Sequence, residues 1–215
     1  MYDFYPHDSF DSYYEEMKMN EIKLYMHKAL KILADIHSKG VIHRDIKPLN
    51  LLYNRNTQDL TIIDFGRAVV YNKKEKRDTK VGSKFFKAPE LLTGYAYYDF
   101  GIDVWNLGII FGSLIFKKYP LFFFRDNKDL LDVVVDVFGF EKLFKFLNKY
   151  SVVLSDVKKK KYFGISQQGF QYFVSQKNGN FLDELALDLL DKMLVIDPND
   201  RITAKEALEH DFFKK

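Results

Sequence analysis

The 215-residue sequence predicts a mainly α-helical domain with one small β-hairpin. Three observations lead to this prediction. Apolar residues recur at helical spacing over several stretches, two short β-type runs flank a polar turn, and a long charged segment without periodicity precedes the later helices. A hydrophobic content of 47% beside 29% charged residues is typical of one globular domain with a sizeable core.

The first half of the chain is predicted to hold a helix, the hairpin and a long loop. Residues 21–39 form the helix, which ends before the C-cap candidate Gly40 and has apolar side chains on one face at Ile22, Tyr25, Met26, Ala29, Leu33 and Ile36. Residues 50–53 and 60–63 form the hairpin around the turn-rich sequence NRNTQD. Residues 64–90 are charged and aperiodic, which predicts a long loop, and such loops are usually functional.

The second half is predicted to be helical. Helices are expected at residues 101–117, 127–138, 141–149, 183–194 and 203–209. Residues 151–180 are predicted to be irregular, and the four lysines at 158–161 to form a solvated face.

Composition excludes several classes of site and location. Without cysteine there is no disulfide framework, thiol nucleophile or cysteine zinc site, and a reducing compartment is permitted. The N-terminal stretch has neither the positive nor the apolar region of a secretory signal, and no apolar run is long enough to span a bilayer. We expect an intracellular protein, in the cytoplasm and/or nucleus, with neither a membrane nor a nucleic acid as partner.

Charge is concentrated in one segment. Residues 67–87 contain eight basic and two acidic residues, a local charge of +6, whereas the whole chain has a net charge of +3. A basic patch of this kind favours an anionic partner.

The strongest chemical signal is the sequence HRDIKPLN at residues 43–50, followed fourteen residues after its last position by DFG at 64–66. Phosphoryl transfer needs a group that orients the attacking hydroxyl, and metal ions that neutralise phosphate charge. Asp45 can accept the proton of a Ser or Thr hydroxyl, and the Lys47 ammonium can lie beside the transferred phosphoryl group. Asn50 and Asp64 offer the oxygen ligands that Mg²⁺ prefers, and the hairpin brings them to the same end.

Each of these residues alone is more often a cap or turn former. Together, at this spacing and around a hairpin, they resemble the signature of eukaryotic-type serine/threonine protein kinases. The resemblance implies ATP and Mg²⁺ as cofactors, with Asp45 and Lys47 catalytic and Asn50 and Asp64 on the metal. It gives structural roles to the remaining motif residues, His43, Arg44, Phe65 and Gly66.

Further matches extend the resemblance from about residue 1 to residue 215. APE at 88–90 closes the activation segment that begins at residue 64, and DVWNLG from Asp103 is similar to the family's central helix, whose Asp caps the catalytic-loop backbone. Arg201 occupies the position of the partner of Glu90. The resemblance therefore implies structural roles for Glu90, Asp103 and Arg201.

Within the kinases the closest resemblance is to the catalytic (alpha) subunit of casein kinase 2. It is carried by HSKGVIHRDIKPLN, KVGSKFFKAPELL, YYDFGIDVWNLG and RITAKEALEHDFF. That family phosphorylates Ser or Thr among acidic residues, which implies acidic protein substrates and substrate-binding roles for Lys80, Lys84 and Lys87. Ser83 matches a small hydroxyl residue near the catalytic Asp.

The sequence departs from casein kinase 2 at several positions. Phe65 replaces a usual Trp and Ala88 a usual Gly, and the basic positions are Lys where Arg is more common, which predicts looser binding of carboxylates. For residues 73–77 a solvated Lys-rich loop is the favoured interpretation.

A Gly-rich phosphate loop and a VAIK-like lysine are absent from the 215 residues. We therefore expect the carboxyl-terminal lobe only, a kinase-like α+β lobe whose amino-terminal β-sheet is absent, with residues 1–10 a hinge remnant. In the resemblance Asp3 and Tyr5 face the adenine, and Leu52 and Ile63 form the apolar floor beneath it. A regulatory subunit could bind if the first lobe exists.

Two functions stay open at this point. The chain is either part of an active acid-directed kinase whose first lobe lies elsewhere, or a catalytically silent lone lobe that binds acidic peptides. Retention of Asp45, Lys47, Asn50 and Asp64 favours the first, since a binding module has no need of metal ligands.

Overall fold

The computed structural model describes residues 5–124, 129–175, 178 and 182–214. Its α-helices are α1 (Phe10–Tyr13), α2 (Met19–Ser38), α3 (Pro89–Thr93), α4 (Gly101–Phe116), α5 (Leu130–Phe138), α6 (Phe140–Lys149), α7 (Asp156–Tyr162), α8 (Glu184–Met193) and α9 (Ala204–Leu208). Its strands are β1 (Val41–Ile42), β2 (Leu51–Tyr53), β3 (Leu60–Ile62) and β4 (Val69–Val70). Short 3₁₀ helices are found at Pro48–Asn50, Phe65–Arg67, Gly169–Phe173 and Asp211–Phe213. The predicted mainly helical class is confirmed.

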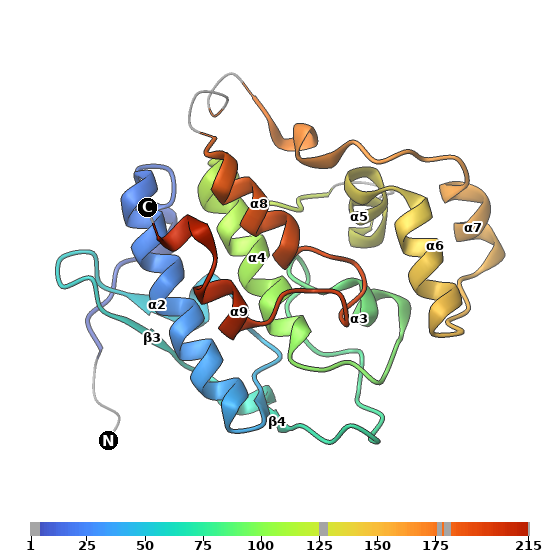
Figure 1. Cartoon of the computed structure of the whole chain (residues 1–215), viewed down its shortest axis with the longest axis horizontal. Coiled ribbons are helices and arrows are strands. Elements are labelled where there is room, and N and C mark those ends of the chain that lie inside the picture. Colours follow the sequence, from blue (N-terminus) through green and yellow to red (C-terminus); the bar gives the residue numbers. More distant parts are fainter. Residues whose placement is uncertain (1–4, 125–128, 176–177, 179–181, 215) are drawn as a thin grey trace.

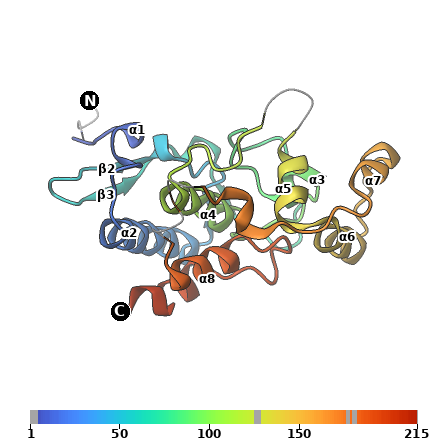
Figure 2. The same ribbon diagram turned by 90° about the horizontal axis from the view of Figure 1, so that it is seen from above.

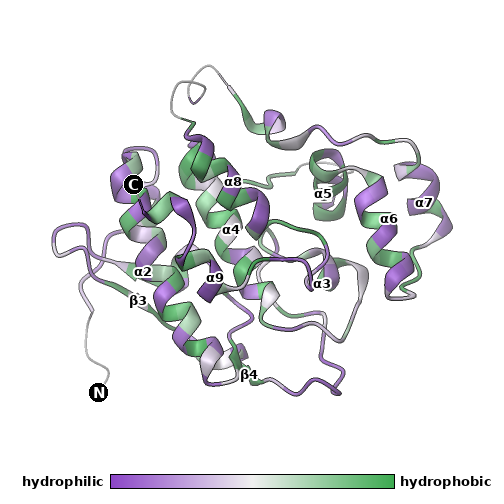
Figure 3. Ribbon diagram, viewed as in Figure 1, coloured by the Kyte–Doolittle hydropathy of each residue, from purple (hydrophilic) through white to green (hydrophobic). Residues whose placement is uncertain are grey.

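Helix α4 forms the centre of the core. All its residues after the first are buried, and α2 and α8 pack against it (Figure 1). Coloured by hydropathy, it is mostly apolar along its length (Figure 3). Gly112 permits the close approach of Leu121, because a Cβ on Gly112 would lie 2.4 Å from Leu121 Cδ2. The prediction of a helix at residues 101–117 is confirmed.

Helix α2 has its predicted apolar face in the core, where Ile22, Tyr25 and Leu33 are completely buried. At its start the Glu21 carboxylate accepts a hydrogen bond from the Lys18 N–H at 3.0 Å, which satisfies one of the free N–H groups of the first turn. Gly40 follows the helix with a φ of +74°, the left-handed conformation that suits glycine at a helix end.

The described residues form two small antiparallel sheets, one more than predicted. The hairpin of β2 and β3 has the register Leu51 with Ile62 and Tyr53 with Leu60. The second sheet pairs β1 with β4, so the predicted loop of residues 64–90 contains a strand and, at its end, the start of α3. Strands of two residues are too short to give an alternating pattern, which is why the sequence did not reveal them.

The segment before α1 lies along the hairpin. The Asp8 N–H donates to the Tyr53 carbonyl at 2.8 Å, and the Asp8 carboxylate accepts from the Arg55 N–H at 2.8 Å. The Pro6 carbonyl accepts from the Asn54 amide at 3.3 Å. Residues 5–8 are therefore held beside the strand that follows Asn50.

Helix α7 corrects the prediction that residues 151–180 are irregular and that their lysines are wholly solvated. Lys158 pairs with Asp129 at 2.6 Å, and Lys161 pairs with Asp132 at 2.8 Å. Buried Tyr162 donates its hydroxyl to Asp132 at 2.8 Å. These contacts attach α7 to the start of α5, and together with α6 the two helices form one end of the molecule (Figures 1 and 2).

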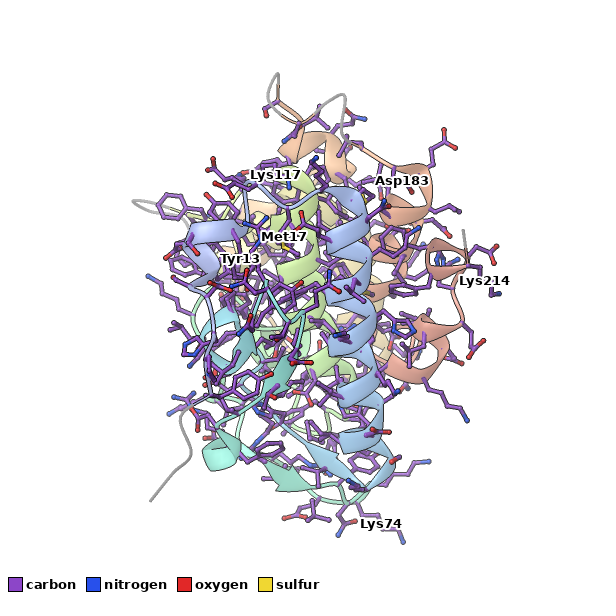
Figure 4. The ribbon with its side chains drawn as sticks, turned by 90° about the vertical axis from the view of Figure 1, so that its left-hand side faces the viewer. Tyr13, Met17, Lys74, Lys117, Asp183 and Lys214 are labelled. Atoms are coloured by element: carbon purple, nitrogen blue, oxygen red, sulfur yellow. The ribbon has the colours of Figure 1, made fainter. Side chains whose placement is uncertain are left out.

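The C-terminal end of α4 is tied to the segment between α1 and α2. The half-buried Lys117 ammonium donates to the carbonyls of Tyr14 and Met17, and Figure 4 shows Lys117 beside Met17. Burial lowers the pKa of Lys117 to about 8.

Among the described residues, none of the helices combines the length and apolar character that a membrane crossing requires.

Candidate active site

Asp103, in the first turn of α4, holds the backbone of the loop that carries Asp45. Its two carboxylate oxygens accept the N–H groups of His43 and Arg44, each at 2.8 Å, and one also contacts His37 Nε2 at 3.0 Å. Arg44 has a φ of +66°, an uncommon conformation for a residue with a Cβ. The bonds to Asp103 stabilise this turn, which directly precedes Asp45.

The Asp45 carboxylate is the centre of the site. It is buried, with 3% of the residue exposed, and accepts hydrogen bonds from Lys47 Nζ and Ser83 Oγ, each at 2.8 Å. Burial acts to raise the pKa of Asp45, but the hydrogen bonds from Lys47 and Ser83 and the charges of Lys47 and Arg67 outweigh it, so the pKa is lowered. The carboxylate is thus held ionised, ready to accept a hydrogen bond from a hydroxyl.

The backbones of Asn50 and Asp64 lie at the same end of the hairpin, as the sequence predicted. The Asn50 carbonyl accepts the Ile63 N–H at 2.9 Å, which places the backbone of Asp64 one residue beyond this contact. The Asn50 amide donates to the Asp45 carbonyl at 2.8 Å, which leaves Oδ1 as the atom that could bind a metal ion. Asp64 is exposed at a φ of +65°, and its carboxylate accepts the Gly66 N–H at 3.3 Å.

These two side chains suit Mg²⁺. That ion is usually held by one or two carboxylate or amide oxygens, with phosphate and water completing its shell. Within the described part of the chain, no group of three or more His, Cys, Asp or Glu side chains could hold a metal ion. The donor set therefore fits an ion that arrives with phosphate groups rather than one bound by protein alone.

His43 and Phe65 support this corner. The completely buried His43 ring contacts the Ile63 carbonyl through Nε2 at 3.0 Å, and its centroid lies 4.9 Å from that of Phe65. Phe65 itself is about half exposed, and Gly66 is exposed. His43 thus joins the loop before β2 to the segment after β3.

Leu52 and Ile63, the predicted apolar floor, lie on the same face of the hairpin. Side chains alternate along strands, and Leu51 and Ile62 point into the core, so Leu52 and Ile63 share the other, half-buried face. Tyr5 is also half buried, in the segment beside the hairpin, whereas Asp3 lies outside the described residues.

The 64–90 segment is anchored by a chain of contacts from Arg44. Its guanidinium donates to the Tyr98 hydroxyl at 3.1 Å, which in turn donates to the Asp78 carbonyl at 2.7 Å. Arg77 is buried, donates to the Tyr98 carbonyl at 2.8 Å and lies over the Tyr71 ring, 4.8 Å from its centroid. The prediction that residues 73–77 are all solvated is therefore wrong for Arg77, although Lys74 points outward (Figure 4).

The three predicted substrate-binding lysines differ in exposure. Lys80 and Lys84 are exposed, and Lys87 is half buried. The Lys80 N–H donates to the Asp78 carboxylate at 2.8 Å, and Lys84 Nζ lies 4.8 Å from the centre of the Phe124 ring. Lys80 precedes Ser83 in the sequence, and Lys84 and Lys87 follow it. Ser83 is the residue whose hydroxyl donates to Asp45.

The structure contains the predicted pair of Glu90 and Arg201. The guanidinium donates to both carboxylate oxygens, at 2.8 and 3.0 Å, and both side chains are completely buried. Arg201 also donates to the carbonyls of Gly101 and Val195, and its guanidinium lies over the Trp105 ring. The pair fixes the end of the 64–90 segment against α4.

Sequence reasoning missed three residues of this site. Arg67 Nε lies 3.9 Å from an Asp45 oxygen, His37 contacts Asp103, and Tyr98 links Arg44 to Asp78. Arg67 was visible as the first member of the basic run, one residue after DFG. Nothing in the sequence indicated the other two, because their partners are distant along the chain.

A family model described as protein kinase domain matches residues 1–213. The chain belongs to the protein kinase family. The match covers nearly the whole chain, including the loop of Asp45, the hairpin and the 64–90 segment. A protein kinase domain acts on protein substrates and generally uses ATP and Mg²⁺, which agrees with the oxygen donors at Asn50 and Asp64.

Proposed function

We propose that this kinase domain transfers the γ-phosphoryl group of ATP to Ser or Thr residues that lie among acidic residues, as casein kinase 2 does. The observation that carries the proposal is the Asp45 carboxylate, which Lys47 and Ser83 hold through both of its oxygens. A group fixed in this way can orient one acceptor hydroxyl.

The chemistry follows from these contacts. The acceptor hydroxyl donates to Asp45, its oxygen forms a bond to the γ-phosphorus, and the bond from that phosphorus to the β-phosphate oxygen breaks. The proton passes to Asp45, and ADP leaves with the electron pair of the broken bond. Lys47 Nζ, 2.8 Å from Asp45, can neutralise charge on the transferred group. Mg²⁺ would neutralise the phosphates when held by Asn50 and Asp64.

The preference for acidic substrates rests on charge beside the acceptor position. Lys80 and Lys84 are exposed on either side of Ser83, and residues 67–87 have a net charge of +6. Lysine ammonium groups attract carboxylates without the paired geometry of arginine, so we expect a preference for acidic sites rather than a strict requirement.

The described residues would form only one wall of a nucleotide-binding site. Leu52, Ile63 and Tyr5 suit one wall of an adenine site, whereas a ligand of this size is normally enclosed on both sides. We propose that a lobe with a Gly-rich loop and a strand lysine supplies the other wall, with residues 1–10 as the hinge and 64–90 as the activation segment.

The test measures phosphate transfer from radiolabelled ATP to a Ser peptide with downstream Asp and Glu, and to a matched peptide with Lys and Arg. It uses the chain alone and the chain joined at its amino end to the first lobe of an acid-directed kinase. We expect little turnover by the chain alone. With the lobe supplied, we expect transfer that favours the acidic peptide and is lost about a hundredfold or more in Asp45→Asn.

Three outcomes would contradict parts of the proposal. Equal rates on both peptides would exclude the acidic preference, and unchanged activity of Asp45→Asn would mean that another residue orients the hydroxyl. Binding of the acidic peptide without transfer in either form would instead support the silent lone lobe.

A further inference from the structure

Three cavities lie around α6 and the segment that follows it, and residues 43–66 line none of them. Figure 1 shows α6 and α7 at one end of the molecule. Their volumes are about 660, 390 and 350 Å³. Phe144 lines both the first and the third, and Val153 lines both the second and the third. The cavities are therefore neighbours, and together they are here called the α6 groove.

The α6 groove exposes large apolar side chains. Val153 is 85% exposed and Phe163 81% exposed, and Phe144 and Tyr97 are each nearly half exposed. All four line the groove. Clusters of this kind are uncommon on a monomer surface and usually mark an interaction site.

The rim of the α6 groove is basic. Its lining includes Lys76, Lys142, Lys145 and Lys159 and one acidic residue, Glu141. Lys145 pairs with Glu141 at 2.7 Å and Lys159 with Asp156 at 3.5 Å, whereas Lys76 and Lys142 have no ion pair among the described residues. Lys76 Nζ lies 5.8 Å from the centre of the Tyr97 ring. Lysines around apolar side chains favour a partner whose apolar groups are flanked by carboxylates.

The walls of the groove are fixed by backbone contacts. The Phe140 N–H donates to the Ile165 carbonyl at 3.0 Å, and the Gln168 N–H donates to the Asp136 carbonyl at 3.1 Å. Gly139 has a φ of +82°, and a Cβ there would lie 2.9 Å from the Gln167 nitrogen. Because these contacts exist without a partner, the chain needs little rearrangement when a partner binds to the groove.

One end of the groove reaches the basic 64–90 segment. Lys76 belongs to that segment, and the next N–H, of Arg77, donates to the Ala96 carbonyl at 2.9 Å, beside the Tyr97 that lines the groove. The groove and the basic segment therefore adjoin at Lys76.

We infer that the α6 groove binds a segment of a partner protein in which Phe or Leu side chains alternate with Asp or Glu. The apolar side chains occupy the cavities around Phe144 and Val153, and the carboxylates face the rim lysines. This site goes beyond the proposed phosphoryl transfer and does not depend on it, because no residue around Asp45 takes part.

The test measures the fluorescence anisotropy of a short labelled peptide of Asp, Glu, Phe and Leu, without Ser, Thr or Tyr, mixed with the full chain. We expect binding that weakens with added salt and is absent for a matched peptide with Lys in place of Asp and Glu. Val153→Asp and Phe163→Ser should each weaken binding about tenfold. The matched control is Val157→Asp, on α7, which is 78% exposed and does not line the groove; it should leave binding unchanged.

Circular dichroism of each variant checks its fold, and the exposure of Val153 and Phe163 makes both substitutions compatible with folding. Absence of binding to the unaltered chain, or an equal loss in Val157→Asp, would overturn the inference. So would self-association of the chain that Val153→Asp abolishes, or binding to vesicles of anionic lipid in place of the peptide. Because the peptide has no acceptor hydroxyl, failure here is separate from failure of phosphoryl transfer.

Discussion

Glu90 and Arg201 form a completely buried two-point ion pair across 111 residues of sequence. The pair joins the first turn of α3 to the segment between α8 and α9, and Arg201 adds bonds to the Gly101 carbonyl at the base of α4. The Arg201 guanidinium therefore connects α3 and the base of α4 to the segment between α8 and α9.

We expect Glu90→Gln to lower the free energy of unfolding by about 3–5 kcal/mol, because it leaves a buried guanidinium without its counter-charge. Urea unfolding followed by circular dichroism measures the effect. Glu141→Gln, which breaks the exposed pair with Lys145, is the control and should leave the midpoint unchanged. Equal midpoints for Glu90→Gln and the unaltered chain would contradict a structural role for the pair.

Lys84→Ala and Lys80→Ala should each raise KM for the acidic peptide about two- to fivefold in the transfer assay, with kcat little changed. The reason is that an exposed lysine contributes to holding the substrate carboxylates equally before and during the reaction. Lys74→Ala changes the same charge at an outward-pointing position (Figure 4) and should have no effect. An equal effect at all three positions would indicate general attraction by the basic segment instead of specific contacts.

Acid should destabilise the contact between α5 and α7. Burial acts to raise the pKa of Asp132, but bonds from Lys161, the Asp129 N–H and Tyr162 outweigh it and lower the pKa below the usual aspartate value of 3.8. The folded state therefore binds fewer protons than the unfolded state in this range, and the stabilisation present above pH 3.8 is lost as pH falls through the folded pKa. Melting temperatures measured against pH should fall less steeply below this value in Asp132→Asn.

The control for that series is Asp191→Asn, an exposed position on α8. It should reproduce the pH profile of the unaltered chain. A profile of Asp132→Asn that is parallel to both would show that Asp132 does not contribute to acid unfolding.

Tyr98→Phe should loosen the 64–90 segment, at a cost of about 1 kcal/mol. The substitution removes the hydroxyl that accepts from Arg44 and donates to the Asp78 carbonyl, and leaves the buried ring in place. Hydrogen exchange of the amides near residue 78 should become faster. Tyr97→Phe, at the exposed neighbouring ring, is the matched control, and equal exchange in the two variants would contradict the role of the Tyr98 hydroxyl.

The elements that sequence reasoning found are those with strong local patterns. Helices α2 and α4 carry apolar residues over several turns, and the hairpin is marked by a polar turn between two β-type runs. The second sheet and α7 were missed for physical reasons. Strands β1 and β4 have two residues each, and α7 is lysine-rich, so its place depends on Asp129, Asp132 and the burial of Tyr162.

The site shows the same division. Asn50 and Asp64 could be placed near each other because they flank one hairpin, Asp45 was found from its motif, and Ser83 came from the family resemblance. The burial of Arg77 could not be predicted, since its hydrogen-bond partners are backbone carbonyls and the Tyr71 ring reaches it only in the folded chain. The role of Tyr98 depends on a hydroxyl that meets Arg44 only in the folded chain.

Asp103 accepts the N–H groups of His43 and Arg44 in the folded chain. The loop that carries Asp45 therefore has its conformational entropy removed during folding, and an arriving substrate does not have to order it. The free energy of binding can then be used to align the acceptor hydroxyl with phosphate. On the proposed function, the first turn of α4 would raise the rate of transfer without touching any reacting atom.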